Sequence, residues 1–298
     1  MNYGRTSLRR RAKQLDARGT RIRHKIGVIL GKLLLIGIIV GGCATVSFGV
    51  GAFKGILASA PDISEVDVIP TGYSTKVLAA DGSETAKLVA AGSNRQYVTI
   101  DQIPENLQHA VVAIEDERFY DHNGIDLKGI VRALVADVRT RDFSQGASTL
   151  TQQLIKNNVL SEQWANENDS NISKMEKMER QVQRKIQEQY LAIELEKKVN
   201  DKNWILENYL NTINLGSGCY GVQTAAQTYF GKDAKDLTLS ECAVLAAIPK
   251  APTAYNPKNH PEKNQQRRDK ILNNMKEQGY ITEEEYTIAM NDNVYDRI

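Results

Sequence analysis

The feature that most restricts what this chain can fold into is a long apolar segment near its N-terminus. Residues 33–53 contain no charged side chain, and residues 26–31 extend the segment with only Lys32 between them. About 20 apolar residues in a helix span the hydrocarbon core of a bilayer, and a single lysine can extend its amine to the headgroups. The sequence therefore predicts one transmembrane anchor over residues 26–53.

The segment before the anchor is strongly basic. Residues 1–25 hold nine Lys or Arg and one Asp, a net charge of +8, and the residues nearest the anchor include Arg18, Arg21, Arg23 and Lys25. Because basic flanks remain in the cytoplasm, we expect a cytoplasmic basic tail over 1–25, a single pass through the cytoplasmic membrane, and an extracellular or periplasmic domain. A cleaved signal peptide is the alternative, since Ala58-Ser59-Ala60 resembles a cleavage site, although the apolar segment is long for a signal peptide.

Charge and cysteine content limit the classes of function. The whole chain of 298 residues has a net charge of +2, so the part outside the basic tail carries −6 and gives no reason to expect nucleic-acid binding. The three cysteines, Cys43, Cys219 and Cys242, have no metal-binding or redox spacing and are too few for a disulfide framework. A disulfide between Cys219 and Cys242 stays an open alternative.

A short β element is expected after the anchor. Residues 74–80 and 84–89 are strand-like and flank Asp81-Gly82, which is a strong hairpin signal. From residue 101 the apolar periodicity is helical. We therefore expect a linker with a β-hairpin over residues 54–100 and a helical domain over residues 101–298.

The stretch with the greatest chemical content is Glu115 to Asp126, where five carboxylates, one imidazole and two aromatic rings occur within twelve residues. It follows the apolar run 110–114, and Pro104 lies near the start of that helix, where its missing N–H costs least. The acids therefore begin where a buried helix ends. A carboxyl at the edge of an apolar wall loses solvation and can exchange protons near neutral pH, whereas the simpler interpretation is a solvated acidic turn.

The next segment is amphipathic at the helical period. Its apolar residues share one face: Leu127, Ile130, Val131, Leu134, Val135 and Val138. Basic residues such as Lys128 and Arg132 lie on the other faces. Two interpretations are open, a helix facing the protein core and a helix lying against a membrane with its basic groups near lipid phosphates.

A loop of small, hydroxyl and amide side chains over residues 146–153 then runs into a helix. Backbone N–H groups at a helix start, hydroxyl side chains and Lys156 suit an anionic or phosphate ligand. Ser or Thr before a helix is more commonly only a cap, and the loop lacks the Gly-Lys-Ser/Thr ending of a nucleotide-binding P-loop.

Helices are expected over most of the remaining chain. Residues 161–180 are polar and predict a partly flexible excursion. In the long helix that follows, Arg184 and Lys185 share a face with Glu188, which in isolation indicates a surface ion-pair ladder. Further helices are expected over 204–211, 239–248, 267–279 and 283–289, two of them capped by Thr238 and Thr282.

These stretches together resemble glycosyltransferase family 51, the peptidoglycan polymerase domain of class A penicillin-binding proteins and of monofunctional transglycosylases. The matching motifs, in order, are Glu115-Asp116-x-x-Phe119-x-x-His122-x-Gly124, Gly146-x-Ser148-Thr149-x-Thr151-Gln152-Gln153-x-x-Lys156-Asn157, Arg184-Lys185-x-x-Glu188, Ile205-Leu206-Glu207-x-Tyr209-Leu210-Asn211 and Glu241-x-Ala243-x-Leu245 leading to Pro249. The resemblance implies a mainly α, lysozyme-like helical domain with a small β-hairpin element, preceded by one N-terminal transmembrane helix.

The resemblance also implies an activity: polymerisation of lipid II into β-1,4 glycan strands, with inversion at the sugar and release of undecaprenyl diphosphate. Glu115 would be the general base on the acceptor 4-hydroxyl, and Glu188 the second catalytic acid. Groups implied to bind substrate are Asp116, Phe119, His122, Gly146, Ser148, Thr149, Gln152, Gln153, Lys156, Asn157, Arg184 and Lys185. For His122 a structural hydrogen-bonding role is favoured over catalysis, and Glu207, Asn211 and Glu241 are taken as supports of the cleft.

No cofactor is firmly implied. Glu188 would either orient the cations or coordinate a divalent Mg or Mn ion near the phosphates. The expected partners are lipid II, the growing glycan strand and membrane lipid, with other cell-wall synthesis proteins as a further candidate. The chain departs from the family in one place. Members of the family usually have a short connection between the second and third motifs, with an arginine that helps to bind the diphosphate. Here residues 158–183 form a long polar segment, and Arg180 is only a guess for that arginine.

Two other functions compete with polymerisation. A lysozyme-like glycan hydrolase would place water between two carboxylates, and a membrane-tethered cell-wall scaffold would have an inactive site. The cations at 156, 184 and 185 favour a diphosphate leaving group over hydrolysis. The chain has no Ser-x-x-Lys with Ser-x-Asn and Lys-Thr-Gly, so no transpeptidase site is expected, and the chain is either an N-terminal piece of a longer protein or a truncated form.

Overall fold

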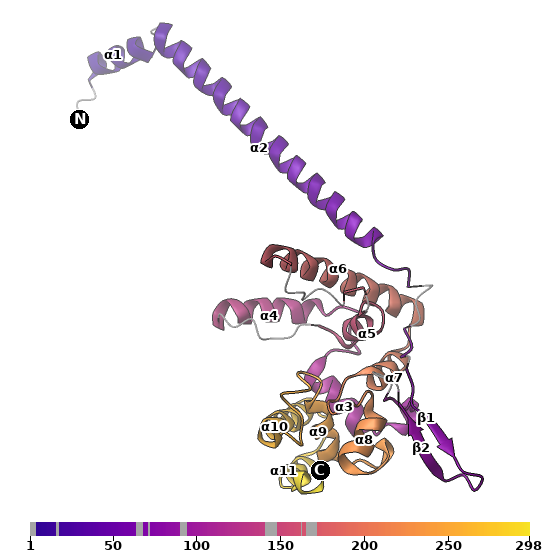
Figure 1. The fold of residues 1–298 in the computed structure, drawn as a ribbon. Helices are drawn as coiled ribbons and strands as arrows, with labels where there is room; N and C mark the ends of the chain where they lie inside the picture. The colour runs from indigo at the N-terminus through magenta and orange to yellow at the C-terminus, as the bar shows by residue number, and fades with distance from the viewer. Residues whose placement is uncertain are drawn as a thin grey trace. The chain divides into compact units, whose positions relative to one another are not determined.

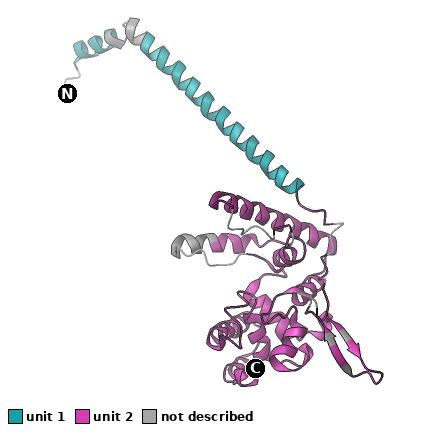
Figure 2. Ribbon diagram, in the orientation of Figure 1, with its two compact units in different colours: residues 1–59 teal, residues 60–298 magenta. Residues whose placement is uncertain are grey.

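The computed structural model describes residues 4–15, 18–63, 68–70, 72–89, 94–140, 148–161, 163–164 and 172–298. The chain divides into two compact units, residues 1–59 and residues 60–298 (Figure 2). The first unit consists of α1 (Arg5–Leu15) and α2 (Arg18–Ala58). Within α2, residues Ile22–Ala58 are long and apolar enough to cross a membrane, which confirms the predicted apolar helix and extends it at both ends.

The second unit begins with the β-hairpin. Strands β1 (Thr75–Leu78) and β2 (Glu84–Leu88) are antiparallel, with Thr75 opposite Leu88. In the turn, Gly82 has a φ of 85°, and Asp81 Oδ1 accepts hydrogen bonds from the backbone N–H and the hydroxyl of Ser83. The hairpin predicted from Asp-Gly is confirmed, and it projects from the helices (Figure 1).

The rest of the unit is helical. Its elements are η1 (Ile100–Gln102), α3 (Glu105–Glu115), α4 (Leu127–Thr140), α5 (Leu150–Asn158), α6 (Lys174–Val199), α7 (Lys202–Thr212), α8 (Val222–Phe230), η2 (Ala234–Asp236), α9 (Leu239–Ala247), α10 (Pro261–Glu277), α11 (Glu283–Met290) and η3 (Val294–Arg297). Hydroxyl caps begin several of them. Thr238 and Thr282 form capping boxes with Glu241 and Glu285, as their spacing predicts.

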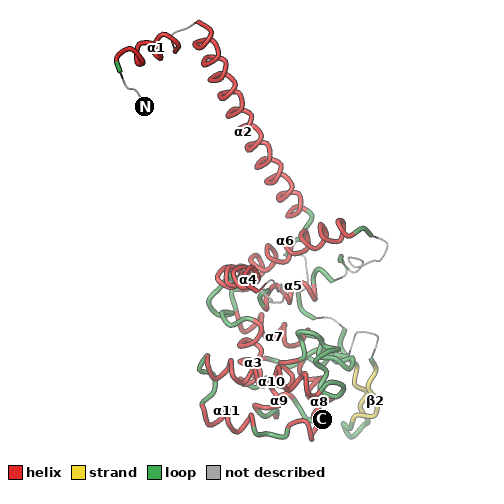
Figure 3. The backbone as a smooth tube through the Cα atoms, turned by 90° about the vertical axis from the view of Figure 1, so that its left-hand side faces the viewer, coloured by secondary structure: helices red, strands yellow, loops and turns green. Residues whose placement is uncertain are grey.

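The helices form two groups, which Figures 1 and 3 show from two directions. In one group α5 packs on α6, and both views show α4 next to α6. In the other, α3 packs on α9 and α10, with α8 and α11 alongside. Helix α7 contacts α5 on one side and α8 on the other. Fully buried side chains such as Phe119, Leu154 and Tyr209 belong to one core that runs through both groups.

Two expectations about these helices were wrong, and one helix was not expected. Helix α6 begins at Lys174 and not after residue 180, because Ser173 accepts a hydrogen bond from Glu176 N and caps it. Helix α10 begins at Pro261 and not at residue 267, since proline is well tolerated in the first turn. Helix α8 was not predicted. Glycines flank it on both sides, Gly221 before it and Gly231 after it, so the sequence has no side-chain cap that would mark its start.

The apolar residues at the start of helix α4 are not all buried. Leu127 and Val131 are 65% and 60% exposed, whereas Ala133 is buried. The side chains of residues 134–140 lie outside the described part. The exposed pair shows that the start of α4 does not pack these two side chains into the core, as the core-facing interpretation required.

The open question about a disulfide is also answered. Cys219 and Cys242 are both buried, and both are free. Burial raises the pKa of the Cys242 thiol, so this cysteine behaves as a small apolar core residue.

Candidate active site

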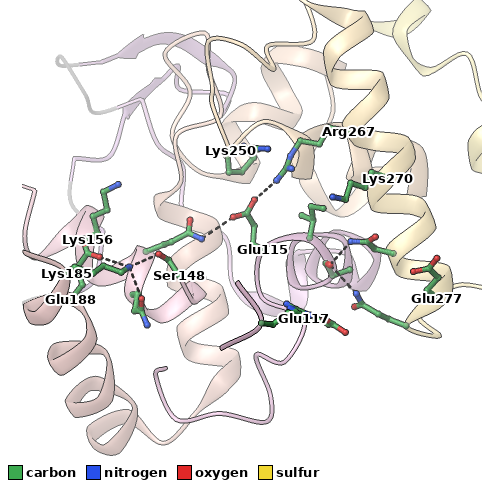
Figure 4. Close-up of a pocket in the computed structure, with 18 of the residues that line it drawn as sticks. Glu115, Glu117, Ser148, Lys156, Lys185, Glu188, Lys250, Arg267, Lys270 and Glu277 are labelled. Carbon is green, nitrogen blue, oxygen red and sulfur yellow. Dashed lines mark hydrogen bonds and ion pairs between the residues drawn. The ribbon is translucent and has the colours of Figure 1, made fainter. Parts of the chain in front are cut away.

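A large pocket of about 1300 Å³ opens between the two helix groups. Its lining includes Glu115 from α3, Lys156 from α5, Lys185 and Glu188 from α6, and Arg267 from α10. Figure 4 shows Glu115 between the side chains of α5 and α6 and those of α10. Residues that are far apart in the chain therefore meet in one cavity.

Glu115 is the last residue of α3, so its carboxylate lies where the buried helix ends. One oxygen, Oε1, accepts a hydrogen bond from Arg267 Nη2 at 2.8 Å, and the other, Oε2, accepts one from Gln153 Nε2 at 3.1 Å. Both oxygens are thus held, from opposite sides. The carboxylate is therefore fixed in position between α5 and α10.

Arg267 is a site residue that sequence reasoning missed. Its Nε donates to the carbonyl of Ala247 at 3.1 Å, and its guanidinium lies 5.6 Å from the centre of the Tyr255 ring. It stands in a polar run that indicates only an exposed helix face, and 152 residues separate it from Glu115. No local signal could have paired the two.

The cations on α6 surround a buried acid. Glu188 is only 2% exposed; its Oε2 accepts from Lys185 Nζ at 3.1 Å and its Oε1 from Arg184 Nη1. The surface ion-pair ladder suggested by the spacing is therefore wrong, because the shared carboxylate lies beneath the surface. Glu188 holds both cationic groups at the pocket wall.

Lys185 also links the second motif to the third. Its amine donates to Ser148 Oγ at 2.6 Å and to Gln152 Oε1 at 3.0 Å, and all three residues line the pocket. Thr149 does not line it: the side chain is buried, accepts from Gln152 N as the helix cap and donates to the carbonyl of Gly124 at 2.7 Å. Asn157 is exposed outside the lining, and Gly146 lies outside the described residues.

The pocket is basic. Seven Lys or Arg and four Glu side chains line it, a net charge of +3. Among the described residues, Lys156, Lys250 and Lys270 have no ion-pair partner and are exposed in this wall. Such groups are available to an anionic ligand.

Four residues of the first motif, Asp116, Phe119, His122 and Gly124, support the pocket without lining it. Asp116 Oδ2 accepts from the backbone N–H of Leu150 at 2.9 Å, and its Oδ1 lies 3.0 Å from His122 Nε2. Phe119 is fully buried in the core. Gly124 has a φ of 87°, and a Cβ there would lie 2.6 Å from the backbone of Ala192, so only glycine fits. This part of the motif ties α3 to α5 and α6.

The remaining candidates also hold the scaffold. Glu207 accepts from the backbone N–H of Ile100 at 2.6 Å, Asn211 bonds both backbone groups of Val98, and Glu241 pairs with Lys232 and Arg297. Arg180 pairs with Glu176 at 2.8 Å and lies outside the pocket lining. The guess that Arg180 binds a diphosphate therefore gains no support.

The groups around Glu188 do not fit a resident divalent cation. Its two oxygens already bind a lysine and an arginine, and these positive charges would repel a metal ion. Within the described ranges no group of three or more His, Cys, Asp or Glu side chains could hold a metal. Glu188 is better explained as the partner of the cations.

The helical domain thus holds an acid, Glu115, and a set of cations in one large pocket. Residues 81–276 match the family described as Transglycosylase. The chain belongs to this family, and the prediction of a mainly helical, lysozyme-like domain with a small hairpin and one apolar N-terminal helix is confirmed.

The chain is also similar in sequence to several penicillin-binding proteins. The chain is 49% identical to penicillin-binding protein 1A of Aquifex aeolicus over 197 residues, which is 66% of this chain and 25% of that protein. It is 43% identical to penicillin-binding protein 1F of Bacillus subtilis over 216 residues, 72% of this chain and 28% of that protein. It is 41% identical to penicillin-binding protein 1A of Streptococcus oralis over 254 residues, which is 85% of this chain and 37% of that protein. The chain thus spans between a quarter and two fifths of these relatives.

A crystal structure of penicillin-binding protein 1A from Haemophilus influenzae aligns at 25% identity over 76% of this chain and 21% of that chain, with a TM-score of 0.40.

Proposed function

We propose that this chain is a peptidoglycan glycosyltransferase, which joins lipid II to a growing glycan strand through β-1,4 bonds and releases undecaprenyl diphosphate. The observation that carries the proposal is that Glu115 shares one pocket with Lys156, Arg184, Lys185 and Glu188. Membership of the transglycosylase family supports it.

Glu115 is the proposed general base. A sugar hydroxyl becomes a competent nucleophile as its proton moves to a carboxylate, and a positioned base contributes about 10²- to 10⁴-fold in rate. The donor sugar carries an α-linked diphosphate, so attack by the acceptor 4-hydroxyl from the opposite face gives the β bond. The proton lost by that hydroxyl passes to Glu115.

The cations are proposed to receive the leaving group. Negative charge grows on the diphosphate as the bond to the sugar breaks, and fixed positive groups stabilise it most in a site that excludes water. Lys156, Arg184 and Lys185 are these groups, while Ser148 and Gln152 hold the Lys185 amine and Glu188 anchors both α6 cations. A net positive pocket favours this reaction over hydrolysis of a neutral glycan.

The membrane is proposed to supply the substrate. The apolar part of the helix over Ile22–Ala58, residues 26–53, would anchor the chain, and residues 1–25 would lie on the cytoplasmic side because their charge is +8. In the second unit, apolar side chains on two helices are exposed and would meet lipid: Leu127 and Val131 on α4, and Met175, Met178 and Val182 on α6. Lipid II, the glycan strand and other cell-wall synthesis proteins are the proposed partners.

The decisive experiment incubates the purified full chain, in detergent or lipid, with labelled lipid II. Glycan polymer and released undecaprenyl diphosphate are the expected products. Cleavage of finished glycan without polymer would instead indicate a hydrolase, and no reaction with either substrate would indicate a scaffold with an inactive site.

A charge substitution tests the proposed role of Lys156. Lys156→Gln should lower kcat/KM for lipid II by about 10- to 100-fold, because a hydrogen bond to a charged group is worth about 1.5–3 kcal/mol. Lys156 is exposed and has no ion-pair partner in the described part of the chain, so Tm should not change. Lys263→Gln, on the exposed face of α10 outside the pocket lining, is the matched control; equal activity of the two variants would contradict the assignment.

A further inference from the structure

Gln153 stands between the proposed base and a buried tyrosine. Its Nε2 lies 3.1 Å from Glu115 Oε2, and its Oε1 lies 3.2 Å from the hydroxyl of Tyr209. The three residues come from α3, α5 and α7. They form one continuous chain of hydrogen bonds that ends at the carboxylate.

The donor and the acceptor of each of these hydrogen bonds follow from the chemistry of the three side chains. A carboxylate without a proton only accepts hydrogen bonds, so the amide must turn its NH₂ group towards Glu115. The amide oxygen then faces Tyr209, and because a carbonyl oxygen cannot donate, the tyrosine hydroxyl must donate to it. If the amide were reversed, its oxygen would face the negative carboxylate.

Tyr209 is suited to hold this arrangement. It is fully buried in the core and does not line the pocket. Burial, together with the nearby carboxylates of Glu115 and Asp116, raises the pKa of Tyr209 well above its usual value. The hydroxyl therefore remains a donor throughout the physiological range.

We propose that Gln153 is a positioning residue for Glu115 and that Tyr209 sets the orientation of the Gln153 amide. This proposal rests on the proposed function, in which Glu115 is the base. Gln153 from α5 holds one carboxylate oxygen, while Arg267 from α10 holds the other. With both oxygens held, the carboxylate keeps a single orientation towards the acceptor hydroxyl, and a misplacement of about 1 Å in such a site can cost about 100-fold in rate.

The proposal assigns Gln153 a different role from that of a substrate ligand. A ligand that binds lipid II equally in the ground and transition states would change KM when removed. A positioning residue changes kcat, because its effect is realised only when the proton is transferred. The two roles are therefore separable by kinetics.

The experiment measures initial rates of lipid II polymerisation by the full chain over a range of lipid II concentrations. The variants are Tyr209→Phe, Gln153→Ala and the double variant, with Tm recorded for each. Tyr229→Phe is the matched control, because Tyr229 is also buried in the core and donates to the carbonyl of Leu215 at 2.8 Å but does not line the pocket.

Tyr209→Phe and Gln153→Ala are each expected to lower kcat by about 10- to 100-fold with KM changed less than about threefold. The double variant should be no slower than Gln153→Ala alone, since a tyrosine that acts through Gln153 has nothing left to act on. Tyr229→Phe should lower Tm about as much as Tyr209→Phe and leave kcat unchanged.

Three results would overturn the proposal: an unchanged kcat in Tyr209→Phe, effects of the two single variants that multiply in the double variant, or a change confined to KM in Gln153→Ala. Failure of the proposed function itself has another signature. In that case the unaltered chain makes no polymer, or Glu115→Gln polymerises as fast as the unaltered chain.

Discussion

Replacing Glu115 with glutamine is expected to reduce the rate of lipid II polymerisation by about 10²- to 10⁴-fold. Glutamine has nearly the size of glutamate, but its amide cannot take a proton from the acceptor hydroxyl at neutral pH. The loss should fall on kcat, while the binding of lipid II, measured directly at equilibrium, should stay close to that of the unaltered chain, because the cations of α5 and α6 remain in place.

Glu117→Gln is the matched control for this prediction. Glu117 lines the same pocket two residues further on, but its carboxylate pairs with Arg132 at 2.9 Å and is 43% exposed. Glu117→Gln should keep most of the activity. If Glu115→Gln retained activity within about threefold of the unaltered chain, a threshold well below the smallest expected effect of a general base, Glu115 would not be the base.

The largest expected effect on stability comes from Lys202. Its amine lies 2.6 Å from Glu196 Oε2, donates to the carbonyl of His122 at 2.7 Å and lies 4.6 Å from the centre of the Phe119 ring. The other oxygen of Glu196 accepts from Thr151 Oγ1. Lys202→Met would leave a buried carboxylate without its cation, which costs about 3–5 kcal/mol and should lower Tm by about 10 °C.

An exposed pair on the same helix as Glu196 provides the comparison. Lys197 and Glu194 lie 2.7 Å apart, but their side chains are 65% and 33% exposed, against 22% and 5% for Lys202 and Glu196. Water screens the exposed pair, so Lys197→Met should change the free energy of unfolding by less than about 1 kcal/mol. Adding Glu196→Gln to Lys202→Met should restore part of the lost Tm. Equal shifts for Lys197→Met and Lys202→Met would show that burial does not control the strength of these pairs.

The candidate site was only partly predictable from the sequence. The position of Glu115 at the end of a buried helix followed from a five-residue apolar run and a proline, and both are local signals. The burial of Glu188 did not follow, because the spacing of Arg184, Lys185 and Glu188 is the same on an exposed face as beside a cavity. Phe119 likewise belongs to a conspicuous motif, yet its ring packs in the core and not in the pocket.

By itself, the sequence determined the elements whose causes lie within a few residues: the apolar helix of the anchor, the Asp81-Gly82 turn, the helices capped by Thr238 and Thr282, and the ordered motifs that indicate the family. Turn geometry, capping and apolar periodicity are short-range effects, so a single segment carries them.

Only the tertiary structure decided which charges meet. It brought Arg267 to Glu115 across 152 residues, placed Gln153 between Glu115 and Tyr209, and buried Glu188 beneath two cations. These contacts arise where α3, α5, α6, α7 and α10 pack around one core. Packing depends on the shapes of whole helix faces and not on any one segment. For that reason, no local sequence pattern could specify these contacts.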